Sequence, residues 1–88
     1  MKLLSLTVST PDGDAFAGEV MALTLRGADG DLAVLPGHIP FITTVKAGKV
    51  ALHMEDGSCR HGITDGGLLT VTGQRTTLLS GSFKWSEE

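Results

Sequence analysis

The chain has 88 residues, 41% of them hydrophobic and 19% charged, and its formal net charge is −3 at pH 7. This length allows a single small domain, and the composition is that of a globular protein rather than a disordered one. The basic residues are scattered, which argues against a nucleic-acid-binding surface, and the single cysteine, Cys59, cannot form an internal disulfide. Polar residues interrupt the N-terminal stretch too often for a signal peptide or a membrane span, so we expect a protein of the cytosolic side.

Short stretches in which apolar and polar residues alternate follow one another along the chain, separated by turns rich in glycine and aspartate. We predict strands at residues 4–9, 21–26, 32–35, 41–45, 49–54, 59–64, 68–72 and 76–79. The stretch 32–35 is wholly apolar, which predicts a strand buried on both faces. No window has a convincing helical period, so the sequence predicts an all-β protein, an antiparallel β-sandwich or flattened barrel.

The apolar members of these stretches form the predicted hydrophobic core. They are Leu4, Leu6, Val8, Val20, Leu23, Leu32, Val34, Val50, Leu52, Leu69, Val71 and Leu78. The last residues break the pattern, because Ser86 followed by Glu87 and Glu88 is typical of a helix N-cap with acidic residues in the first turn.

Residues capable of catalysis or metal binding occur, but not in patterns that define a site. Cys59 and His61 share one face of a predicted strand and His53 lies on its hairpin partner, yet no further ligand completes a tetrahedral zinc site. The chain has no Gly-Lys-Ser/Thr phosphate loop and no Gly-x-Ser-x-Gly nucleophile elbow. We therefore expect no enzymatic activity, no metal and no cofactor.

A stiff corner, Leu-Pro-Gly-His-Ile-Pro, joins two apolar stretches at residues 35–40. The rings of Pro36 and Pro40 fix their own backbone and bias the residue before each towards an extended conformation. Gly37 permits the tight reversal, and His38 is left at the surface. Turn geometry accounts for the prolines and the glycine, but it would accept almost any polar residue in place of the histidine.

Five sequence blocks stand in a fixed order along the chain: Thr10–Gly13, Phe16–Val20, Gly27–Pro40, Ala47-Gly48 and Gly66–Leu68. In this order they resemble, over nearly the whole chain, the N-terminal domain of the epsilon subunit of the F-type ATP synthase. The Leu-Pro-Gly-His-x-Pro block is the most specific of them. Three positions depart from the family pattern: Asp31 replaces the usual glutamate, Ala33 the usual glycine and Ala47 a common proline.

The resemblance implies a ten-stranded antiparallel β-sandwich over residues 1–83, with residues 84–88 as the junction towards a C-terminal helical hairpin that is absent from this chain. It further implies a non-catalytic central-stalk (rotor) subunit of a bacterial F-type ATP synthase, peripheral on the cytoplasmic side of the cell membrane. Its partners would be the gamma subunit and the membrane c-ring, so that proton or sodium translocation is coupled to ATP synthesis.

The resemblance also assigns roles to residues of the Gly27–Pro40 block. Partner contacts fall to Asp31, His38, Ile39 and Pro40, and turn-shaping roles to Gly30, Pro36 and Gly37. The resemblance places Asp31 at the same end of the domain as the corner.

Two other classes of protein remain as alternatives: a metal-dependent β-barrel enzyme of the cupin type, and a small ligand-binding sandwich unrelated to a rotary machine. The lack of a His-x-His pair argues against the first class. The scarcity of aromatic residues, with no tyrosine and one tryptophan, argues against a ligand pocket of the second class.

Overall fold

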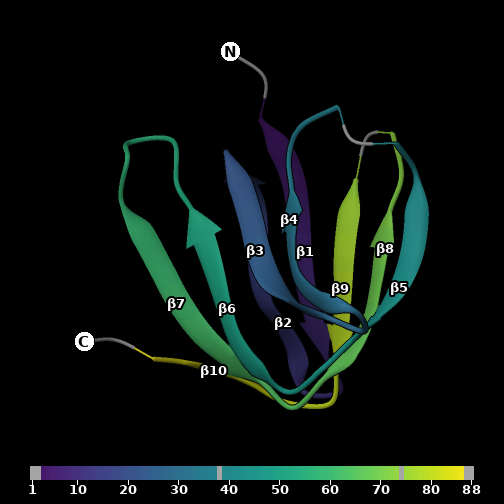
Figure 1. Cartoon of the computed structure of the whole chain (residues 1–88). Coiled ribbons are helices and arrows are strands. Elements are labelled where there is room, and N and C mark those ends of the chain that lie inside the picture. Colours follow the sequence, from purple (N-terminus) through teal and green to yellow (C-terminus); the bar gives the residue numbers. More distant parts are fainter. Residues whose placement is uncertain (1–2, 38, 74, 87–88) are drawn as a thin grey trace.

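The computed structural model describes residues 3–37, 39–73 and 75–86, and in them the chain forms ten strands (Figure 1). In chain order these are β1 (Leu4–Thr10), β2 (Gly13–Val20), β3 (Ala22–Gly27), β4 (Gly30–Val34), β5 (Phe41–Val45), β6 (Gly48–His53), β7 (Cys59–Thr64), β8 (Gly67–Val71), β9 (Thr76–Ser80) and β10 (Phe83–Trp85). The predicted all-β fold is confirmed. In the part of the chain described, no helix is long and apolar enough to cross a membrane.

Hydrogen bonding arranges the strands in the order β10-β7-β6-β3-β5-β8-β9-β1-β2, with β4 paired to β3 beside this path. The sheet bends where β3 meets β5, at the single pair Gly27↔Val45, so that two five-stranded halves enclose the core. One half consists of β10, β7, β6, β3 and β4, and the other of β5, β8, β9, β1 and β2. All pairs are antiparallel except one: β1 and β9 run parallel, from Leu6↔Thr76 to Ser9↔Leu79.

Two strands, β2 and β10, escape the prediction from alternation. Most residues of β2 are small or polar, and only Val20 is buried, because β2 is the outer strand of its half. It forms through pairing with β1 over its whole length. β10 pairs with β7, so strand structure continues past residue 83 to Trp85. The expected helical turn involves Glu87 and Glu88, which lie outside the described residues.

The core lies between the two halves. Every predicted core residue is buried except Leu32, which is partly buried and packs against the core, and Leu25 and Val45 join the set. The prediction that residues 32–35 are buried on both faces is wrong: Ala33 is exposed and Leu35 is 53% exposed. β4 is the outer strand of its half, so one of its faces remains in solvent.

The connections between strands alternate between two ends of the sandwich. At one end, here called the acidic end, lie the turns 11–12, 28–29, 46–47, 65–66 and 81–82. These turns contain Asp12, Asp29 and Asp65 and one basic residue, Lys46. At the other end, here called the corner end, lie residue 21, the described corner residues 35–37 and 39–40, the turn 54–58, and residues 72, 73 and 75.

Candidate functional site

Asp31 lies at the acidic end, in the β3–β4 hairpin. The hairpin turns tightly between the paired residues Gly27 and Gly30, and Gly30 has a φ of 132°, a conformation that favours glycine. Directly after the turn, Asp31 pairs with Arg26, and Asp31 Oδ1 lies 3.7 Å from Arg26 Nε. The Asp31 side chain is 88% exposed, so this ion pair is weak and the carboxylate is accessible to a partner.

The corner itself presents apolar surface. Ile39 is 74% exposed and Pro40 is also exposed. Gly37 has a φ of 83°, and a Cβ added there would meet no atom within 4 Å, so its role is conformational rather than a matter of space. Pro36 is half-buried at the base of the corner. His38, the remaining contact residue predicted in the corner, lies outside the described residues.

The structure separates Asp31 from the corner. Strand β4 runs from Gly30 to Val34, and Asp31 lies near its first residue while the corner follows its last. At about 3.3 Å per residue, Asp31 and Leu35 are roughly 13 Å apart along the strand. Asp31 therefore lies at the acidic end and the corner at the opposite end, so the expectation that they share one end is wrong. Asp31 therefore cannot form one compact site with Ile39 and Pro40.

An uncharged outer face adjoins the corner. Strands β1, β5, β8 and β9 contain no charged residue. On their outer side Leu68 pairs with Leu79, and Ile42 lies diagonally across from Leu68. These three side chains are 67% (Ile42), 37% (Leu68) and 48% (Leu79) exposed. We call this outer side of the four strands the uncharged face. Contiguous exposed apolar side chains without charges are typical of surfaces that bind other proteins.

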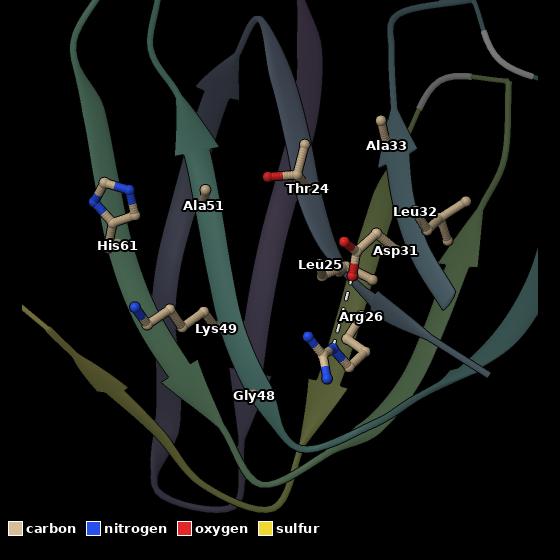
Figure 2. A pocket seen from close by; sticks show the side chains of 10 residues that line it. All are labelled: Thr24, Leu25, Arg26, Asp31, Leu32, Ala33, Gly48, Lys49, Ala51 and His61. Carbon is tan, nitrogen blue, oxygen red and sulfur yellow. Dashed lines mark ion pairs between the residues drawn. The ribbon is translucent and has the colours of Figure 1, made fainter. Parts of the chain in front are cut away.

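The outer side of the other half is hollowed and charged. Figure 2 shows a shallow pocket whose floor is a row of small side chains, Ala51, Thr24 and Ala33, on neighbouring strands. His61 continues the row on β7. Arg26, Lys49 and Asp31 stand along one side of it. The two outer sides of the sandwich thus differ in chemistry. The first carries charge only on its outer strand β2, where Asp14 and Glu19 lie opposite Ser9 and Ser5 of β1, and the second carries charges of both signs.

A cysteine and two histidines meet beside this pocket. Cys59 Sγ lies 3.8 Å from His53 Nδ1 and 3.6 Å from His61 Nε2, and His53 Nε2 lies 3.4 Å from Thr24 Oγ1. Among the residues for which the structure gives positions, no group of three His, Cys, Asp or Glu side chains could hold a metal ion. The cluster is explained by strand register, since His53 and Cys59 are direct cross-strand partners.

Both the sequence and the ten-stranded fold have matches among known proteins. The family model for the ATP synthase delta/epsilon chain β-sandwich domain matches residues 3–86. The chain belongs to this family. It is 33% identical over 87 residues to the ATP synthase epsilon chain of Bacillus velezensis, and 32% identical over 87 residues to that of Bacillus subtilis. The alignment covers 99% of this chain but 65% of each relative.

Solved structures of the ATP synthase contain the same fold. A chain of the Euglena gracilis mitochondrial ATP synthase superimposes with a TM-score of 0.89 at 21% identity, covering 94% of this chain and 53% of that one. A chain of the Tetrahymena thermophila mitochondrial ATP synthase central stalk and c-ring superimposes with a TM-score of 0.74 at 10% identity, covering 93% and 66%. The ten-stranded fold is thus retained at low sequence identity.

The sequence motifs described above do not predict the uncharged face. Its signal is present in the sequence as two Leu-Leu pairs, Leu68-Leu69 and Leu78-Leu79, in which one leucine is buried and the other exposed. In an alternating strand the outward position usually carries a polar residue. A leucine on both sides of the strand therefore indicates a second apolar contact besides the core.

Proposed function

We propose that this delta/epsilon sandwich is a non-catalytic subunit of the central stalk of a bacterial F-type ATP synthase. It joins the gamma subunit to the membrane c-ring, and so couples ion translocation to ATP synthesis from the cytoplasmic side of the cell membrane. Membership of the family argues against a cupin-type enzyme or a free ligand-binding sandwich. The observation that carries the proposal is the uncharged face, because a solvated domain with no partner does not need it.

Two parts of the surface suit two different partners. The uncharged face and the adjoining corner, with His38, Ile39 and Pro40, offer an apolar contact, which suits a stable protein partner such as gamma. Asp31 at the acidic end offers an exposed carboxylate to polar loops of the c-ring, a contact governed by charge. Gly30, Pro36 and Gly37 shape the backbone that presents these residues. In this arrangement the sandwich transmits force between these two contact surfaces, a task that suits a rigid β-structure.

The test is co-purification of the chain with the gamma subunit of the same organism. Replacing Ile42 by aspartate puts a charge on the uncharged face, which should reduce recovery of the complex about tenfold or more because a charge would be buried unpaired. The control is Ile63→Asp, because Ile63 is 47% exposed on β7, in the other half of the sandwich. Ile63→Asp should leave recovery unchanged. Equal recovery of the two variants would contradict the proposal.

The domain boundary is also part of the proposal. We propose that β10 (Phe83–Trp85) is the last element of the sandwich, so that the junction towards a helical hairpin in the longer members of the family begins after Trp85 rather than at residue 84. Limited proteolysis of a longer family member should then cut after residue 86 of the corresponding sequence and leave the sandwich whole. Cleavage inside β10 would place the boundary earlier.

A further inference from the structure

The outer strands β2 and β10 come together on one side of the sandwich without sharing a ladder of hydrogen bonds in the described residues. They lie at opposite ends of the hydrogen-bonded path, but Phe16 of β2 contacts Trp85 of β10, with ring centroids 6.2 Å apart and planes at 71°. Phe83 also contacts Trp85, with ring centroids 5.1 Å apart and planes at 87°. Aromatic side chains rather than backbone hydrogen bonds hold this seam closed.

Strand β10 is fixed firmly at its beginning. Asp65 Oδ1 accepts a hydrogen bond from the Ser82 backbone N–H at 3.0 Å. The Asp65 backbone N–H in turn donates to the Ser82 carbonyl at 3.3 Å, and Ser80 Oγ donates to the same carbonyl at 2.6 Å. This network ties the β9–β10 turn to the β7–β8 turn, so the start of β10 cannot move without breaking several hydrogen bonds.

The far end of β10 is held by side chains and a short ladder. Three residue pairs join β10 to β7, and the Ser86 N–H donates to the His61 carbonyl at 2.8 Å. Arg60 Cζ lies 3.9 Å from the centroid of the Trp85 ring, a cation–π contact. Phe83 rests over Gly62, where any Cβ would overlap its ring. Phe16, Phe83 and Trp85 are partly buried and pack against the core, so release of these contacts uncovers one side of the core but breaks no strand pairing other than that of β10 with β7.

We infer that β10 is a hinged strap, which opens as a unit about Gly81 and Ser82 while strands β1 to β9 stay folded. Opening removes Trp85 from Phe16 and Arg60 and leaves the edge of β7 unpaired, and an unpaired edge can accept another strand. The chain that follows residue 86 is attached to the free end of the strap. Displacement of that following segment therefore acts first on the Phe16–Trp85 seam, and only through it on the sandwich. This inference does not depend on the proposed function.

Native-state hydrogen exchange on the whole chain, at increasing sub-denaturing urea, tests the inference. The Ser86 amide, beyond the hinge, should exchange through an opening that exposes little surface, so its exchange rate should depend little on urea. We expect this rate to be on the order of 100-fold faster than that of core amides of β8. The Asp65 amide, which donates to Ser82 at the hinge, should exchange with the core amides. Trp85 is the single tryptophan, and acrylamide should quench its fluorescence more strongly at urea concentrations below the global unfolding transition.

Variants at the seam complete the test. Phe16→Ala removes the ring on β2 that Trp85 contacts, and should speed exchange at Ser86 about tenfold more than at Asp65. Arg60→Met keeps the side-chain stem but removes the cation over Trp85, and should act in the same direction with a smaller effect. If Ser86 and Asp65 exchange with the same urea dependence, or if Phe16→Ala accelerates both equally, the strap does not open independently and the inference is wrong.

Discussion

Leu78 and Leu79 are neighbours on β9, yet Leu78 is fully buried in the core and Leu79 is 48% exposed on the uncharged face. Two adjacent leucines thus serve different contacts: Leu78 packs inside the domain, and Leu79 is available to a partner outside it. Leu78→Ala should lower the free energy of unfolding by about 2–5 kcal/mol, because it leaves a cavity in the core. Leu79→Ala should change it by about 1 kcal/mol or less, since the site is at the surface. Urea denaturation followed by circular dichroism measures both.

The second half of this prediction concerns binding. Leu79→Ala should weaken association with the gamma subunit although the domain remains stable, while a domain destabilised by Leu78→Ala should bind normally whenever it is folded. Equal stability losses for the two variants would show that Leu79 belongs to the core.

Gly67 should tolerate no larger residue. A Cβ at Gly67 would overlap the backbone carbonyl of Leu79 on the neighbouring strand, so Gly67→Ala must push β8 away from β9. We expect a loss of roughly 3 kcal/mol or more, or failure to fold. Gly48 is the matched control, because its φ of 153° is close to the 158° of Gly67 and a Cβ there meets nothing within 4 Å. Gly48→Ala should cost about 1 kcal/mol, from backbone conformation alone.

Asp31 and the corner should affect different partners. Asp31→Asn should leave thermal stability within about 0.5 kcal/mol, because its ion pair with Arg26 is exposed. It should weaken association with the c-ring, and the difference from the parent protein should shrink as salt screens the charge. Ile39→Asp or His38→Ala should instead weaken association with gamma. Binding assays with each partner separately measure this, and loss of both contacts in every variant would contradict two separate surfaces.

The β6–β7 hairpin contains one carboxyl group with a shifted titration. Ser58 donates to Asp56 Oδ1 through its hydroxyl at 2.6 Å and through its backbone N–H at 2.8 Å, and these bonds lower the pKa of Asp56 from the ordinary 3.8. Because the pKa is lower in the folded state, the bonds contribute stability above the unfolded pKa, and this contribution is lost as pH falls through the folded one.

Ser58→Ala removes the hydroxyl hydrogen bond, which lowers the pKa of Asp56 more than the backbone one does. The substitution should therefore raise the pKa of Asp56 towards its ordinary value. Carboxyl carbon shifts followed by NMR during an acid titration measure it. Thr44→Ala, which removes an exposed hydroxyl on β5, should leave the Asp56 titration unchanged. An unchanged Asp56 titration in Ser58→Ala would mean that the backbone bond alone sets the pKa.

The sequence predicts strands where apolar and polar residues alternate, because such strands have one buried face. β3, with Leu23 and Leu25 buried, is found for this reason. β2 is missed because it is an outer strand of mostly small or polar residues in which only Val20 is buried. The contact surface depends on register and on which end of a strand a residue occupies. Asp31 and Ile39 are eight positions apart in the sequence, but which end each occupies is known only once β4 is placed between them.

The parallel pairing of β1 with β9 governs the order in which the protein can be completed. β1 pairs on one edge with β2, which follows it directly in the sequence, but its other edge is paired only by residues 76–79. Until then that edge is open to association with other chains. Such a pairing between distant parts of the sequence slows folding. A nascent or truncated chain that ends before residue 76 therefore keeps an aggregation-prone edge, whatever the quality of its remaining core.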